Sequence, residues 1–224
     1  MYKLLIIISL CFSFSLKAQN NWEKLNEQAL QAYRAGNFSD ALITYEQALK
    51  QAEKEFGKTD EKYAKTSNSL AYLYCKQQMF SKAEALYKEA RTLAEKKSGK
   101  ESRDYALMCN KLAIDVYYVQ KQYTKAEPLL VEVKNIQEKL LGKEHPDYAM
   151  AASSLAIILY EQKKFKDAEP LFLGAKNILE KVYGKKHPEH LLICNYLINL
   201  YNLQNKTALA DLLIKEVEDA QKQN

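Results

Sequence analysis

Apolar residues recur along most of the chain at steps of three and four, the spacing that places side chains on one face of an α-helix. In one stretch Leu70 and Tyr74 mark an apolar face, and Phe80, Ala83 and Tyr87 mark another. A short run of polar residues separates the two patterns. Because a short turn makes successive helices antiparallel neighbours, this stretch is predicted to form a helical hairpin.

The hairpin pattern repeats along the chain with a nearly constant period. Alanine recurs at spacings of 42, 43, 42 and 42 residues, at Ala41, Ala83, Ala126, Ala168 and Ala210. Glycine recurs at spacings of 42, 43 and 42 residues, at Gly57, Gly99, Gly142 and Gly184. A fixed period of this length indicates repeats that stack and bury their apolar faces against one another. We therefore predict an all-α solenoid of five antiparallel helix pairs, with repeats over about 22–57, 61–99, 103–142, 146–184 and 188–222.

The junctions between repeats carry residues that end one helix and begin the next. Each recurring glycine follows a second helix, where a residue with positive φ ends the helix at little cost. Three residues later comes the predicted N-cap position, occupied by Asp60, Ser102, His145 and His187. Aspartate and serine are strong N-caps, and Pro146 and Pro188 then fall at the first helical position, which tolerates a missing N–H. The predicted helix boundaries therefore agree with the repeat period.

The motifs Leu-Ala-x-x-x-Tyr and Phe/Tyr-x-x-Ala-Glu-x-Leu resemble the tetratricopeptide repeat (TPR). Leu-Gly-Lys-Glu-His-Pro-Asp-Tyr-Ala at 141–149 and Tyr-Gly-Lys-Lys-His-Pro-Glu-His-Leu at 183–191 are similar to the kinesin light chain subclass of 42-residue repeats. The earlier junctions depart from this pattern, because Asp60-Glu61 and Ser102-Arg103 replace His-Pro. The resemblance implies a right-handed superhelix that binds proteins, with the first helix of each hairpin lining its concave surface.

The resemblance and the repeat register together predict a peptide-binding groove. One equivalent position of each first helix carries an amide or hydroxyl, at Asn26, Asn68, Asn110, Ser153 and Asn195. A buried amide without partners costs about 1–3 kcal/mol, so these residues suit a groove that bonds a peptide backbone better than a core. Simple solvation on an exposed face is the alternative. The register adds further groove candidates at Tyr72, Lys76, Ile114, Tyr118, Ile157, Tyr160 and Asn199, of which the tyrosines could equally be core residues.

The single 43-residue step places one extra residue inside a predicted helix, at about 114–116. An extra residue within a helix is expected to form a π-bulge, a feature frequent at functional sites. Two readings of this bulge stay open. It could aim Asp115 toward the groove, or it could be a neutral insertion that only shifts the superhelical twist.

The first eighteen residues differ from the rest of the chain. Lys3 is followed by an apolar run of about thirteen residues, which is too short for a helix that spans a bilayer of roughly 30 Å. A small residue, Ala18, ends this segment, so 1–18 is predicted to be a secretory signal peptide and 19–224 the mature solenoid. A retained anchor is the alternative. We expect export, most simply to a periplasm, although secretion remains open.

Composition and candidate chemistry favour a binding protein over an enzyme. Of the 33 basic residues 30 are lysines, and they alternate with glutamates, which describes solvated helix faces and not a nucleic-acid surface. The repeat register accounts for His187 and His190, and no nucleophile has a histidine in matching register, so we predict no metal, cofactor or catalytic residue. Cys109 and Cys194 are predicted to be buried and too far apart for a disulfide.

Two functions follow from the sequence. The first is a scaffold that holds a segment of another protein in its groove. The second is a structural subunit that joins a larger assembly through its ends. The last helix bears on this choice, since Leu209, Leu212, Leu213 and Val217 are expected to share one inward side and leave a polar cap, which favours a monomer.

Overall fold

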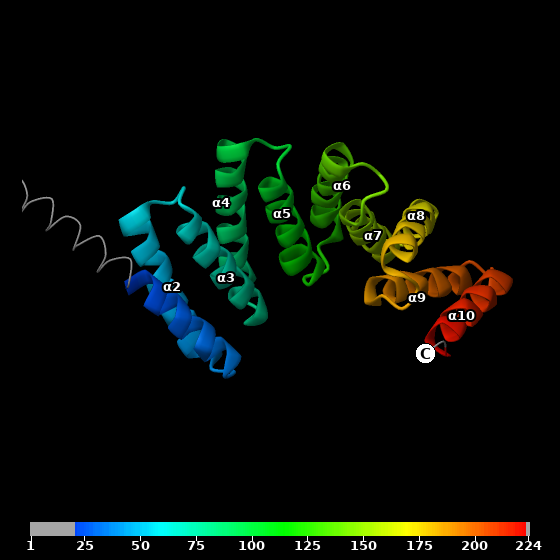
Figure 1. The fold of residues 1–224 in the computed structure, drawn as a ribbon, viewed down its shortest axis with the longest axis horizontal. Helices are drawn as coiled ribbons and strands as arrows, with labels where there is room; N and C mark the ends of the chain where they lie inside the picture. The colour runs from blue at the N-terminus through cyan, green and yellow to red at the C-terminus, as the bar shows by residue number, and fades with distance from the viewer. Residues whose placement is uncertain (1–20, 223–224) are drawn as a thin grey trace, which may run out of the picture. The chain divides into compact units, whose positions relative to one another are not determined.

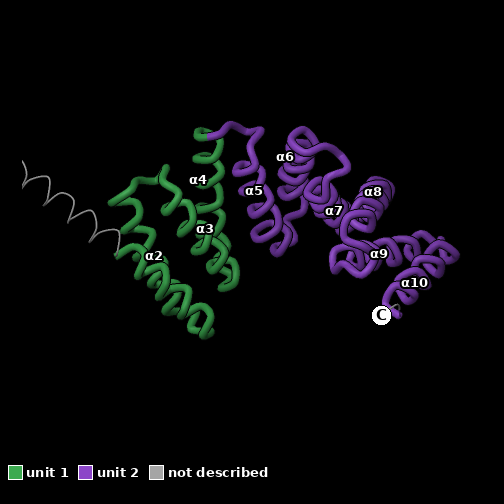
Figure 2. Tube along the Cα trace, viewed as in Figure 1, with its two compact units in different colours: residues 1–97 green, residues 98–224 purple. Residues whose placement is uncertain are grey.

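The computed structural model describes residues 21–222, and within that range every regular element is helical (Figure 1). The all-α prediction is therefore confirmed. The chain divides into two compact units, residues 1–97 and residues 98–224 (Figure 2). The predicted signal peptide lies outside the described residues.

Unit 1 contains a helical segment over residues 21–34 and then α2 (Phe38–Phe56), α3 (Glu61–Lys76) and α4 (Phe80–Ser98). Its core gathers Trp22, Ala48, Ala52 and Tyr63, with Leu93 of α4 packed against them. The alanines allow close helix approach because they are fully buried and carry only a methyl group. The large rings fill the space that remains.

Unit 2 runs through α5 (Arg103–Lys111), η1 (Leu112–Tyr118), α6 (Tyr123–Leu141), α7 (Pro146–Glu161), α8 (Phe165–Tyr183), α9 (Pro188–Leu203) and α10 (Thr207–Lys222). Successive helices pack as neighbours: α7 lies between α6 and α8, and α9 contacts α8 and α10. The helices α7 and α9, which are the first helices of successive hairpins, also touch. This is the arrangement that stacked hairpins require.

The junction residues act as the sequence predicts, with one exception. Gly57 and Gly142 end helices with φ of 81° and 82°, and Asp60 accepts a hydrogen bond from the Lys62 amide at 2.8 Å. Ser102 and His145 accept cap bonds in the same way. His187 stands at the N-cap of α9 but makes no side-chain cap bond.

The turn inside each hairpin uses a positive φ as well, and this feature was not predicted. In three of the five turns a residue other than glycine or asparagine adopts it: Gln78 (φ 58°), Lys121 (φ 57°) and Lys163 (φ 62°). Gly36 and Asn205 hold the equivalent position. A Cβ makes this conformation unfavourable, so the turn stores a small strain that glycine would relieve.

The Ala-Glu pair of the repeat motif has a structural role in unit 2. Ala126 and Ala168 are fully buried. The glutamate that follows each alanine accepts a hydrogen bond from a lysine at the turn of the next hairpin, because Lys164 Nζ lies 2.8 Å from Glu127 and Lys206 Nζ lies 2.8 Å from Glu169. The Lys164 bond lowers the pKa of Glu127. The motif thus joins consecutive repeats.

A second contact links an aromatic residue of a first helix to a glutamate of the second helix. Tyr63 donates to Glu89 at 3.0 Å, and Tyr105 donates to Glu132 at 3.2 Å. Burial and then the Glu89 bond raise the pKa of Tyr63 to about 12. In the next repeat Gly174 stands where the register calls for glutamate.

The predicted π-bulge is confirmed. A π-helix covers Leu112–Tyr118 and encloses the extra residue of the 43-residue repeat. Leu112, Val116 and Tyr117 remain buried across it, so the wider turn keeps the apolar face directed inward after the insertion.

The expectation for the last helix is wrong for two of its four residues. Leu213 is buried and Val217 is half-buried, but Leu209 is 44% exposed and Leu212 is 67% exposed. On a helix Leu212 lies about 100° around from Leu213, and the buried face of α10 is formed by Ala210, Leu213 and Ala220. The end of unit 2 therefore has exposed apolar side chains.

Candidate functional site

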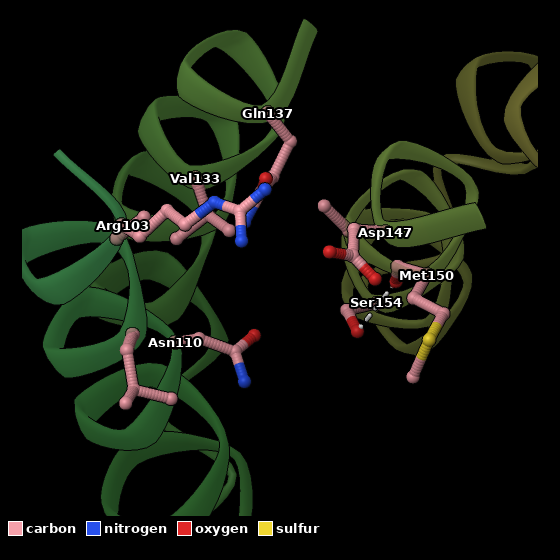
Figure 3. A pocket seen from close by; sticks show the side chains of 10 residues that line it. Arg103, Asn110, Val133, Gln137, Asp147, Met150 and Ser154 are labelled. Atoms are coloured by element: carbon pink, nitrogen blue, oxygen red, sulfur yellow. Dashed lines mark hydrogen bonds between the residues drawn. The ribbon is translucent and has the colours of Figure 1, made fainter. Parts of the chain in front are cut away.

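A cavity of about 200 Å³ opens between α5, α6 and α7 of unit 2 (Figure 3). Residues of all three helices line it: Arg103, Ala106, Leu107, Asn110, Val133, Gln137, Asp147, Met150, Ala151 and Ser154. Two of the helices, α5 and α7, are the first helices of adjacent hairpins. The cavity therefore lies between the first helices of two adjacent hairpins.

The apolar part of this site is exposed to solvent. Leu107 is 47% exposed and Met150 is 42% exposed, and both line the cavity. Leu192 of α9 stands at the equivalent position and is 47% exposed. Three successive first helices thus present an apolar side chain to solvent at the same register position. This row was not predicted, although its spacing of 43 and 42 residues is visible in the sequence.

Charged and polar side chains of α5 and α7 face one another across the cavity. Figure 3 shows Arg103 and Asn110 extending from α5 toward Asp147 and Ser154 of α7. Gln137 of α6 also lines it, and its buried side-chain oxygen has no hydrogen-bond partner. An unpaired buried acceptor is costly, and a donor on a bound molecule would satisfy it. The site can thus hold an apolar group and accept a hydrogen bond from a donor beside that group.

Of the predicted groove residues in unit 2, Asn110 alone lines this cavity. Ile114 and Ile157 are half-buried, whereas Asn195 and Asn199 of α9 are exposed. The Ser153 hydroxyl donates to the Met150 carbonyl at 2.9 Å, so it bonds within its own helix. Asp115 is half-buried on η1 and does not line the cavity.

The two predicted groove tyrosines of unit 2 belong to an aromatic cluster. Tyr160 packs edge to face against Tyr196, with 5.3 Å between their ring centroids. The ring centroids of Tyr118 and Tyr123 are 6.0 Å apart. Tyr196 stacks on the buried Phe172 at 5.4 Å. Burial and a hydrogen bond with Tyr118 raise the pKa of Tyr196. These rings hold neighbouring repeats together.

In unit 1 the predicted residues have unequal surroundings. Asn26 is bonded internally, because it donates to the Trp22 carbonyl at 3.1 Å and accepts from the Thr66 hydroxyl at 3.0 Å. The side-chain oxygen of Asn68 is buried without a hydrogen-bond partner. Tyr72 is 36% exposed, and the ammonium of Lys76 lies 5.2 Å from its ring centroid. Asn26 therefore supports the core, whereas Asn68 and Tyr72 retain groups that a ligand could bind.

A second polar cluster joins α8, α9 and α10. Ligand atoms of Glu180, His190 and Glu216 lie within 4.8 Å of one another, which is close enough to hold a metal ion. However, the buried Lys176 ammonium lies 3.0 Å from Glu216 and 3.3 Å from Glu180, and Lys185 lies 3.1 Å from Glu216. Two ammonium groups already neutralise the two carboxylates, so the cluster is better explained as an ion network than as a metal site.

The family of the chain follows from its repeats. Residues 23–96 and 107–173, together more than half of the chain, match the tetratricopeptide repeat family. The chain therefore belongs to the tetratricopeptide repeat family, and its fold is the TPR solenoid, a scaffold suited to protein binding. No protein with a curated description matches the chain.

Solved structures agree with this fold. The nearly identical TPR-like repeats of a Podosopora anserina protein described as a kinesin light chain are 21% identical, with a TM-score of 0.75 over 90% of this chain and 97% of that chain. BtubC from P. vanneervenii is 19% identical, with a TM-score of 0.76 over 92% of this chain and 89% of that chain. The apo form of RapI is 15% identical, with a TM-score of 0.76 over 91% of this chain and 54% of that chain. At these identities the likeness concerns the fold alone. Within residues 21–222 no helix is long and apolar enough to cross a membrane.

Proposed function

We propose that this protein is an exported TPR scaffold, of the kinesin light chain-like type, that holds a segment of another protein in the groove of unit 2. The observation that carries the proposal is the cavity between α5, α6 and α7, where exposed Leu107 and Met150 adjoin Asn110 and the unpaired oxygen of Gln137. This combination suits an extended segment, because apolar contacts give affinity and amides bond its backbone.

A fold relative supports binding as a use of such repeats. A Rap protein that is 16% identical has been solved in complex with the Competence and Sporulation Factor. We propose that the present chain likewise acts by binding and not by catalysis, without a cofactor and without nucleic acid.

Site-specific photocrosslinking tests the groove. The crosslinking amino acid p-benzoylphenylalanine is placed at Leu107, inside the cavity, and in a matched control at Leu173, which is 37% exposed on α8 and does not line it. We expect a crosslinked protein partner in native cells from the Leu107 position only. Equal products from both positions, or none from Leu107, would refute the groove assignment.

Export is tested separately. The predicted signal peptide and Ala18 imply a mature N-terminus at Gln19 and recovery in the periplasmic fraction. Mass spectrometry of the protein purified from its native cells, after cell fractionation, measures both. An intact Met1 in the cytoplasmic fraction would contradict export.

The alternative function is assembly through the ends of the solenoid. Its support is α10, where Ile214 is 38% exposed although the equivalent Phe172 and Leu130 are fully buried. Light scattering over a range of protein concentrations separates the two functions. A monomer at all concentrations supports the scaffold, whereas a dimer that is lost in Ile214→Lys supports assembly.

A further inference from the structure

The groove helices of unit 2 differ in charge from the rest of the chain. The whole chain carries 33 basic and 28 acidic residues. Nevertheless α7 and α9 contain no lysine or arginine and three acids, Asp147, Glu161 and Glu189. On α5 and η1, Arg103 and Lys111 are balanced by Asp104 and Asp115. The excess negative charge therefore lies on α7 and α9.

These acids lie on the same helix face as the exposed apolar row. Asp147 and Met150 line the cavity together, and Ile157 and Glu161 follow at helical steps of three and four beyond Ser154. On α9 the same register places Glu189 one turn before Leu192. A bound peptide segment that covers this exposed apolar row would therefore pass beside the three carboxylates.

The same register positions in unit 1 show that acids are not required by the fold. In α3 the three equivalent positions are all lysine, at Lys62, Lys65 and Lys76. In unit 2 the position of Lys62 is acidic in all three repeats, at Asp104, Asp147 and Glu189. The position of Lys65 is apolar, at Leu107, Met150 and Leu192. The position of Lys76 varies, with Val119, Glu161 and Leu203. First helices of this chain thus accept either sign of charge at these positions. Asp147 and Glu189 also lie in the first turn of α7 and α9, where a carboxylate suits the positive end of the helix dipole.

Two of the three carboxylates are largely exposed, and the third, Glu161, is half-buried. Asp147 and Glu189 are 48% and 42% exposed in their side chains, and their near neighbours are the histidines His145 at 3.9 Å and His187 at 3.3 Å. Glu161 accepts one hydrogen bond, from Tyr123 at 3.2 Å. Within residues 21–222 no lysine or arginine forms an ion pair with these three acids, although Arg103 of α5 faces Asp147 across the cavity.

From this charge and shape we infer that the segment bound in unit 2 is a cationic amphipathic stretch of a protein. Its apolar side chains cover Leu107, Met150 and Leu192, and its lysine or arginine side chains pair with Asp147, Glu161 and Glu189. Charge complementarity of this kind selects the partner and accelerates its binding. The inference rests on the proposed groove function and adds the chemistry of the partner.

Fluorescence anisotropy with defined peptides tests the inference. Three short labelled peptides share the same leucine positions and carry lysine, glutamine or glutamate between them. The purified chain is expected to bind the lysine peptide most tightly. The triple variant Asp147→Asn, Glu161→Gln, Glu189→Gln should weaken that binding about tenfold at low salt and much less at high salt, as expected for three partly exposed ion pairs.

A matched variant removes the same net charge away from the groove. Asp211→Asn, Glu218→Gln, Asp219→Asn changes three exposed acids of α10 and should bind the lysine peptide like the parent chain. Equal weakening in both variants, a preference for the glutamine or glutamate peptide, or no binding of any peptide overturns the inference. If photocrosslinking at Leu107 still captures a partner whose contacting segment is neutral or acidic, the groove function stands and only the cationic partner is refuted.

Discussion

Gly174 offers a test of how the repeats are held together. It lies within α8 and is exposed, and a Cβ built on it meets no atom within 4 Å. At the equivalent positions Glu89 and Glu132 accept hydrogen bonds from Tyr63 and Tyr105. Gly174 therefore leaves Tyr148 without that glutamate, and it weakens the helix at the same point.

The expected gain can be worked out for two variants. Glycine is about 1 kcal/mol less favourable than alanine inside a helix, so Gly174→Ala should stabilise the chain by about that amount. Gly174→Glu should gain a similar helical contribution and about 1 kcal/mol more from a charge-assisted bond with Tyr148. For a chain of this size about 1 kcal/mol corresponds to roughly 2–4 °C in Tm.

Urea unfolding followed by circular dichroism measures both variants, with Gly174→Ala as the matched control for the glutamate. Tyr148→Phe is then introduced into the parent and into Gly174→Glu. We expect it to be nearly neutral in the parent and to cost about 1 kcal/mol in the glutamate variant. A destabilised Gly174→Ala, or an equal cost of Tyr148→Phe in both backgrounds, would refute this reasoning.

Three further predictions concern strain, pH and an internal network. Lys163→Gly at the positive-φ turn (φ 62°) should raise the free energy of unfolding in urea by about 0.5–1 kcal/mol. An unchanged value would mean that the turn is unstrained. Burial, followed by the nearby Lys176 charge, lowers the pKa of His190, so its stabilising contribution is complete above about pH 6.5 and is lost as the pH falls below that value. His190→Tyr should therefore flatten the loss of Tm between about pH 7 and 5.5, and an unchanged slope would contradict this. Thr66→Val should lower the free energy of unfolding by about 1–3 kcal/mol, because the Trp22 indole N–H loses its acceptor, the Thr66 hydroxyl at 3.0 Å. An unchanged free energy of unfolding would contradict that bond.

The local features of the fold could be read from the sequence because their causes lie within a few residues. Gly57 and Asp60 end one helix and begin the next through their own backbone and side chain. The π-helix followed from counting residues between repeats, since an extra residue inside a helix has to widen one turn. The positive-φ turn at Lys163 was missed because lysine carries no signal for that conformation.

The candidate site was only partly accessible from the sequence. Register gave Asn110, which lines the cavity, and Asn26 the same predicted role. Thr66, forty residues away along the chain, bonds Asn26 internally, and no periodic pattern specifies that contact. Gln137 was missed because it belongs to a second helix, and its contribution to the cavity depends on how three helices meet.

The helices, their boundaries, their repeat register and the family follow from sequence alone, because periodicity and capping act through neighbouring residues. Which of the equivalent side chains remain available depends on tertiary packing. Asn26 is bonded to the core, Tyr160 is packed against Tyr196, and Leu107 is left open to solvent. Residues at one register position share a helix face, but their partners come from other helices, and those partners differ from repeat to repeat.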